Sequence, residues 1–295
     1  MGKLYFVNKK TKSIKMAVLG SVKNEYTLFS KLVYEVLKEY SGCILAMETV
    51  DGLLRKENER KPSETLKNEQ IPQCKITSGI NSYPAYPLYT KISRILYDWL
   101  KNGKCDTRTP ELLEECRNKT EKQMSRDFVD QKLKEYLLSD EICTRKGLIL
   151  EILENLKLRG ILDLLGMKQT VGSVDILPPS LSTIWESFTR KHKQNAELSC
   201  GARALSKHCH RDSTSQWWGT STGSEGNKNE HANQVLDKIL ADAVWINIHL
   251  LPHDVKILEV RNQLGYGARW SYDGMIFRGF LEPQMSDGHS VGWRH

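Results

Sequence analysis

The sequence predicts an α+β protein, with a mostly helical N-terminal half followed by a C-terminal module of helices and a three-stranded antiparallel β-meander. Apolar residues recur at three- and four-residue spacing through most of residues 1–175, which indicates amphipathic helices. Three alternating segments separated by two turn signals make up Lys256–Pro283, which indicates the meander. All eight histidines and six of the seven tryptophans lie in residues 185–295, so the composition changes together with the expected architecture.

The N-terminal half is expected to contain four helices that pack through their apolar stripes. Four prolines among polar residues indicate a long loop over residues 59–87. No fixed repeat period is present, so a helical solenoid is not supported and a bundle that packs, scaffolds or binds a partner is expected. The helical patterns run over Tyr26–Tyr40, Leu88–Gly103, Thr109–Asp140 and Lys146–Met167, the third with Thr109 as N-cap and Pro110 in its first position.

A boundary is expected near Val171–Ser180, which divides the chain into a helical supporting region, residues 1–175, and an α+β module, residues 176–295. The pair Pro178-Pro179 argues against a helix at this point. Ser180 can cap the helix that follows, because a serine hydroxyl accepts from the first free backbone N–H groups.

Three helices and a polar loop are expected between this boundary and the meander. The loop is Asp212–Asn229, which is too polar and rich in glycine to be regular. A capping box of Asn227 and Glu230 is expected to start the last helix. The segment Trp245–His253 then leads into the meander. The expected helices follow Ser180 and run over Glu197–His210 and Glu230–Ala243.

The two turns of the meander predict its register. The dipeptide Asp273-Gly274 indicates a two-residue hairpin, which sets Trp270 opposite Phe277 and Arg269 opposite Arg278. A three-residue turn ending at Gly265 sets Glu259 opposite Arg269. One face of the meander is then apolar and includes Trp270, and the other face carries Glu259, Arg261, Gly267, Arg269, Arg278 and Glu282.

The expected opposition of Arg269 and Arg278 requires a compensating anion, because like charges directly opposite on a sheet are destabilising. Glu259 and Glu282 can supply it from within the chain, which would make the arginines structural. A bound phosphate or carboxylate can supply it instead, since guanidinium groups bind both. The sequence leaves both interpretations open.

The composition excludes several classes of protein. No apolar run approaches the roughly 20 residues that span a bilayer, and the N-terminus has no secretory pattern. Seven scattered cysteines without a C-x-x-C indicate reduced thiols, so a cytoplasmic or nuclear location is expected. The net charge of +7 permits an acidic protein segment, an anionic small molecule or nucleic acid as partner, without requiring nucleic acid.

No metal site is expected, and the sequence does not identify a cofactor. The one H-x-x-x-H spacing, His249 to His253, contains Pro252, which argues against the helix that would bring two imidazoles together. The loop through Gly219 and Gly223 precedes a helix and can bind an anion through backbone N–H groups. A surface loop without such a role is the favoured interpretation, because no phosphate-binding fingerprint is present.

Acid–base chemistry has candidate residues in the module, namely His253 and His289 with Glu259 and Glu282. Whether the protein is an enzyme is left open. The leading hypothesis is an intracellular protein whose C-terminal module binds an anionic ligand or an acidic partner segment. The alternatives are an enzyme acting on a phosphorylated or carboxylated substrate, and an interaction scaffold with structural Arg–Glu pairs. The candidate binding residues are Arg261, Arg269, Arg278, Trp270, Gly267, Gly219 and Gly223.

Overall fold

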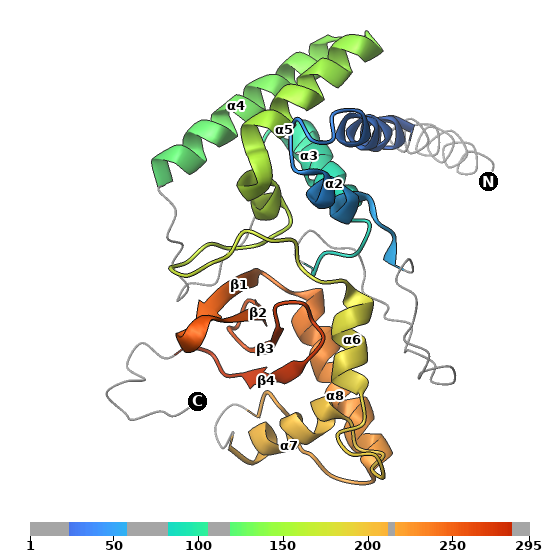
Figure 1. Cartoon of the computed structure of the whole chain (residues 1–295), viewed down its shortest axis with the longest axis vertical. Coiled ribbons are helices and arrows are strands. Elements are labelled where there is room, and N and C mark those ends of the chain that lie inside the picture. The colour runs from blue at the N-terminus through green and yellow to red at the C-terminus, as the bar shows by residue number, and fades with distance from the viewer. Residues whose placement is uncertain (1–23, 58–81, 106–118, 212–215, 285–295) are drawn as a thin grey trace, which may run out of the picture.

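The computed structural model describes residues 24–57, 82–105, 119–211 and 216–284. The helices of the N-terminal half lie at one end of the molecule, and the C-terminal part combines further helices with a four-stranded antiparallel sheet (Figure 1). The predicted α+β fold with a helical N-terminal half is therefore confirmed. The N-terminal helices are residues 24–39, α2 (Met47–Leu54), α3 (Leu88–Asn102), α4 (Lys119–Leu138) and α5 (Ile142–Leu164).

The predicted apolar stripes form the core between these helices. Phe29 and Val33 of the first helix are at most 1 % exposed, as are Ile92 and Leu96 of α3. Gly103 ends α3 in the left-handed conformation, with its N–H donating to the Trp99 carbonyl. The short helix α2 was not predicted. Thr109, Pro110 and most of the predicted proline-rich loop lie outside the described residues.

The C-terminal module contains the helices α6 (Leu181–Thr189), α7 (Cys200–Arg211) and α8 (Glu225–Ala241). Ser180 caps α6 as predicted, because its hydroxyl accepts from the Thr183 N–H. The predicted start of α8 is wrong. Ser224 is the cap, with its hydroxyl accepting from the Asn227 N–H, so α8 begins five positions before Glu230.

Tertiary contacts explain the earlier start of α8. The carboxylate of Glu225 accepts from the Glu197 N–H at 2.8 Å, and the Asn229 amide oxygen accepts from the Ser199 N–H at 2.9 Å. The Asn229 amide N–H also donates to the Glu197 carbonyl at 2.8 Å. The first turn of α8 is thus tied to the start of α7, and these polar residues are helical although they have no apolar spacing.

The sheet has the order β1 (Trp245–Leu251), β2 (Val255–Arg261), β3 (Gly267–Ser271) and β4 (Phe277–Leu281), all antiparallel. The meander therefore has one strand more than predicted, because the segment expected to lead into it forms β1. A short 3-10 turn, η2 (Pro252–Asp254), connects β1 to β2.

The predicted register is confirmed between β2 and β3, where Glu259 lies opposite Arg269. Trp270 lies opposite Phe277, also as predicted, but a bulge then shifts the pairing and places Gly279 opposite Arg269. The predicted opposition of Arg269 and Arg278 is therefore wrong. The extra residue in β4 removes the like-charge pair that strict alternation would have created.

The bulge also changes which β4 side chains share a face. Phe280 lies opposite Ala268 on the apolar face, and Gly279 shares the face of Arg269. The apolar face packs against the helices of the module, since the Trp270 indole N–H donates to the Ile184 carbonyl of α6 at 3.2 Å. Trp270 is fully buried, so this predicted binding residue belongs to the core.

The edge of β1 that faces away from β2 is covered by residues 167–174. This segment overlaps the start of the predicted boundary region, Val171–Ser180. The Lys168 N–H donates to the Ile246 carbonyl at 2.7 Å, and the Val174 N–H donates to the Ile248 carbonyl at 2.8 Å. The Leu250 N–H donates to the Gly172 carbonyl at 2.9 Å. This segment, here called the edge segment, joins the helical half to the sheet. None of the described helices is sufficiently long and apolar to cross a bilayer.

Candidate functional site

Glu282, which follows β4, is held by two side chains from the region of α7. The His208 Nδ1 lies 2.8 Å from Oε1 of Glu282. The indole N–H of Trp218 donates to both carboxylate oxygens at 2.8 Å. Because an ionised carboxylate only accepts hydrogen bonds, the proton of a neutral His208 lies on Nδ1 and Nε2 is left as a base.

The His208–Glu282 pair lies in a partly open, aromatic setting. The side chains of His208 and Glu282 are 15 % and 19 % exposed, so solvent or a ligand reaches both. The His208 ring lies 5.0 Å from Trp218 and 6.0 Å from Phe280, centre to centre. Trp218 itself is fully buried, so it fixes the carboxylate against the core.

A further aromatic pair lies beside Trp218. The rings of Trp217 and Tyr266 are stacked at 4.1 Å with an interplanar angle of 3°. Tyr266 also meets Trp218 edge-on at 5.2 Å. Trp217 is partly exposed, whereas Tyr266 is buried. This stack packs the turn before β3 against the segment that supplies Trp218.

The second charged cluster centres on Glu259 of β2, on the face of the sheet that carries Arg269. Arg261 Nε donates to Oε1 of Glu259 at 2.6 Å, and an Arg269 terminal nitrogen donates to Oε2 at 2.9 Å. His249 Nε2 lies 3.5 Å from Oε2. Glu259 is only 5 % exposed, so the cluster is a buried ionic network.

The network keeps Glu259 ionised. Burial raises its pKa, but the hydrogen bond from His249 and the charges of Arg261 and Arg269 lower the pKa more, to well below its usual value. A terminal nitrogen of Arg261 also donates to the carbonyls of Gly265 and Glu282, at 2.7 and 2.8 Å. Arg261 thus connects the Glu259 cluster to the backbone of Glu282.

The structure brings both predicted glutamates to histidines, but to other histidines than predicted. His249 lies beside Glu259 and His208 beside Glu282. Within the described chain no hydrogen bond or ion pair joins His253 to either glutamate, because it lies exposed on η2 in the left-handed conformation. His289 lies outside the described residues.

The backbone conformation and packing of the chain explain the glycines that were predicted as binding residues. A Cβ on Gly267 would lie 2.4 Å from the Val260 carbonyl oxygen, so this position requires close backbone packing. Gly219 and Gly223 both have positive φ in the segment before α8. Arg278 is exposed beside the bulge of β4.

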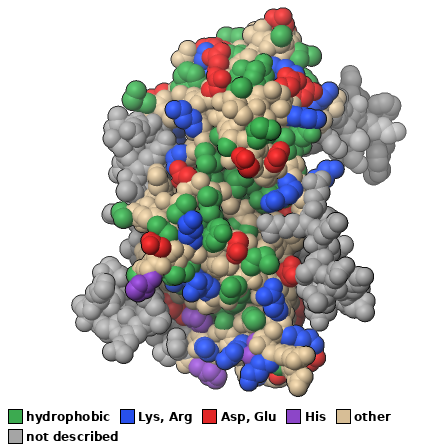
Figure 2. Space-filling view, viewed as in Figure 1, with side chains coloured by type: hydrophobic (Ala, Val, Ile, Leu, Met, Phe, Trp, Pro, Cys, Tyr) green, Lys and Arg blue, Asp and Glu red, His purple; other side chains and the backbone are tan. Residues whose placement is uncertain are grey.

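Sequence reasoning missed His208 and Trp218 as site residues. His208 was not among the candidate residues, and Trp218 was part of the expected loop Asp212–Asn229. The sequence feature that could have indicated this site is the pair of adjacent tryptophans in a polar loop, because such large rings are usually buried against other residues. No three His, Cys, Asp or Glu side chains of the described residues are grouped closely enough to hold a metal ion. In the space-filling view the visible histidines lie over the C-terminal module (Figure 2).

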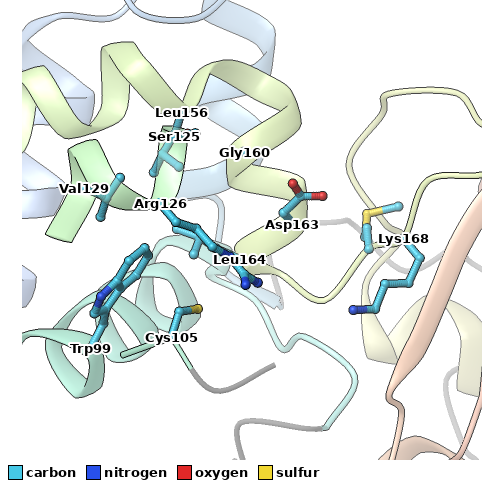
Figure 3. Close-up of a pocket in the computed structure, with 11 residues that line it drawn as sticks. Trp99, Cys105, Ser125, Arg126, Val129, Leu156, Gly160, Asp163, Leu164 and Lys168 are labelled. Atoms are coloured by element: carbon cyan, nitrogen blue, oxygen red, sulfur yellow. The ribbon is translucent and has the colours of Figure 1, made fainter. Parts of the chain in front are cut away.

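A separate pocket lies between the helices of the N-terminal half (Figure 3). Arg126, Asp163 and Lys168 contribute charged groups to it. Lys168 also belongs to the edge segment, so the pocket adjoins the sheet. No predicted site residue lines it. The lining residues are Trp99, Cys105, Ser125, Arg126, Val129, Leu156, Gly160, Asp163, Leu164, Met167 and Lys168.

The match to a known family lies in the C-terminal module and does not include this pocket. Residues 188–282 match the family model of the CdiA C-terminal tRNase toxin domain. The match begins within α6 and ends at Glu282, so it includes both charged clusters and leaves the N-terminal half unmatched. No curated protein and no solved structure matches the chain.

Proposed function

We propose that the C-terminal module cleaves RNA, with a tRNA as its substrate, and that the His208–Glu282 pair carries the proton transfers. The match of residues 188–282 to a tRNase toxin domain supports the substrate class. The 2.8 Å contact between His208 Nδ1 and Glu282 supports the assignment of the pair, because a carboxylate-held imidazole is a common acid–base unit. The anionic ligand expected from the sequence is then the RNA backbone.

The chemistry follows from the tautomer of His208. Nε2 takes the proton of a ribose 2′-hydroxyl while that oxygen attacks the adjacent phosphorus. The P–O5′ bond breaks, a 2′,3′-cyclic phosphate forms, and the imidazolium returns its proton to the departing 5′ oxygen. Glu282 stabilises the imidazolium through the bond to Nδ1, and Trp218 holds the carboxylate in place. The 2′-hydroxyl requirement restricts this reaction to RNA.

The surroundings of the pair suit this substrate. The partly exposed Trp217 lies on the segment that supplies Trp218, and aromatic rings stack on nucleobases. The net charge of the whole chain, +7, favours association with a polyanion, with +6 of it in residues 1–175 and +1 in the module. A tRNA substrate corresponds to the cytoplasm, one of the two locations expected from the cysteines.

The test is cleavage of tRNA by the purified full chain. We expect His208→Ala and Glu282→Gln to lower the cleavage rate about 100-fold or more, as is typical when a general acid–base group is removed. His210→Ala is the matched control, because His210 lies on the same helix and is exposed. It should cleave at the wild-type rate.

The products give an independent check. Wild-type cleavage should leave a 2′,3′-cyclic phosphate, and a DNA strand of the same sequence should remain intact. Full activity of His208→Ala, or equal cleavage of DNA, would contradict this mechanism. Binding of tRNA by the wild type without any cleavage would show a binding module instead of an enzyme.

A further inference from the structure

Arg269 has a hydrogen-bond donor that no described residue satisfies. One terminal nitrogen donates to Glu259, but Nε is buried and has no hydrogen-bond partner among the described residues. The side chain as a whole is 23 % exposed, so a ligand can reach part of it, while Nε itself is closed to solvent. A buried donor without a partner costs about 1–3 kcal/mol, and more on a charged group, so a local shift that gives Nε an acceptor would be favourable.

The neighbouring strand leaves room for such an acceptor. Gly279 lies directly opposite Arg269 in the register of β3 and β4. A Cβ built on Gly279 meets no atom of the described residues within 4 Å, so the described chain leaves the space beside Gly279 open. Side chains of directly opposed residues project to the same face, at a strand separation of about 4.8 Å. A phosphate-sized group therefore fits over Gly279 next to Arg269.

The charge of the cluster favours an anion at this point. Glu259 is ionised and carries one negative charge against the two arginines. Arg261 is occupied by Glu259 and by the carbonyls of Gly265 and Glu282. Among the described residues, the excess positive charge of the cluster is thus concentrated on Arg269, the arginine whose Nε has no partner there.

We propose that Arg269 binds a phosphate group of the RNA backbone in the space over Gly279. The identity of this phosphate rests on the proposed function. Phe280, the next residue of β4, points to the opposite face and packs against His208. The phosphate at Arg269 is therefore not the one that is cleaved. Because β4 is an edge strand of the sheet formed by the described residues, one RNA chain can cross it and contact both faces.

Binding of tRNA, measured over a range of salt concentrations, tests this proposal. The measurement compares His208→Ala alone with the same variant carrying Arg269→Gln or Arg190→Gln. Arg190 is exposed at the end of α6 and serves as the matched control. Arg269→Gln should weaken binding several-fold and reduce the salt slope by about one, the amount expected for one lost phosphate contact. Arg190→Gln should change binding less than twofold.

Two further measurements guard against a folding defect. Inorganic phosphate should raise the melting temperature of the wild type beyond an ionic-strength control, and Arg269→Gln should remove that increase. Arg269→Lys keeps a positive charge near Glu259 but lacks the Nε donor, so it should fold and bind tRNA with intermediate affinity.

The proposal is overturned if Arg269→Gln and Arg190→Gln bind tRNA equally well with equal salt slopes. Stabilisation by inorganic phosphate alone, with unchanged tRNA binding, overturns the assignment to RNA. The proposed catalysis has its own test: it is wrong if His208→Ala cleaves tRNA at the wild-type rate. Even then, weaker tRNA binding by Arg269→Gln would still support the phosphate site.

Discussion

At the scale of single residues, Glu259 shows what holds a buried charge in this fold. Its carboxylate accepts from Arg261 and Arg269 at 2.6 and 2.9 Å while it is only 5 % exposed. Removing one partner of a buried ion pair leaves the other partner uncompensated. We therefore expect Glu259→Gln to lower the free energy of unfolding by roughly 3–5 kcal/mol at pH 7, measured by urea denaturation.

The lowered pKa of Glu259 also determines how this loss of stability depends on pH. The pKa of Glu259 lies below its usual value of 4.5, so its contribution is complete above pH 4.5 and decreases as the pH falls below that value. The stability difference between wild type and Glu259→Gln should therefore shrink between pH 4.5 and pH 2.5. Glu154→Gln, at an exposed position of α5, should show no such difference. A constant difference over this range would contradict the ionised network.

At the scale of elements, α8 and β4 depart from their local patterns for different reasons. In β4 the bulge inserts one residue, so that Gly279 takes the place expected for Arg278 opposite Arg269. In α8 the first turn is polar and is helical through its contacts with the start of α7. The cap at Ser224 then satisfies the Asn227 N–H at 3.3 Å.

The two possible caps of α8 can be separated by mutation. Ser224→Ala should lower the free energy of unfolding by about 1 kcal/mol, because the Asn227 N–H loses its acceptor. Asn227→Ala should be nearly neutral, since Asn227 is exposed within the helix and alanine has the higher helix propensity. Thermal or urea denaturation of both variants measures this. A larger loss for Asn227→Ala would restore the capping box expected from the sequence.

At the scale of the whole molecule, the edge segment bears on where the module begins. The predicted boundary near Val171–Ser180 separates this segment from the sheet that it covers. Asn247 of β1, which is 2 % exposed, donates its amide N–H to the Thr170 hydroxyl at 2.9 Å, and its amide oxygen accepts from the Ser173 hydroxyl at 2.8 Å. A fragment of residues 176–295 would lose these partners and expose the edge of β1.

Two fragments test this consequence. Residues 166–295 should have a higher melting temperature than residues 176–295, because only the longer fragment keeps the edge segment. The shorter fragment should also self-associate more strongly through its free strand edge, which light scattering would detect. Equal melting temperatures would mean that the edge segment contributes nothing, and that the boundary predicted from the sequence is adequate.

Local patterns in the sequence were sufficient for the fold class, most helices and the register of β2 with β3. An apolar stripe such as that of α3, the cap at Ser180 and the turn at Gly265 each depend on residues that are close in the chain. Propensity, capping and turn geometry act over that same short range, so the sequence alone reveals them.

The site itself depended on contacts between residues that are far apart in the chain. Glu282 was a candidate from the sequence, but its partners His208 and Trp218 come from other elements, 74 and 64 positions away. The bulge that separates Arg269 from Arg278 lies in β4, a strand that packs against α7 through the contact of Phe280 with His208. Which side chains meet across a sheet or a helix pair is set by packing of the whole core, and no local spacing records it.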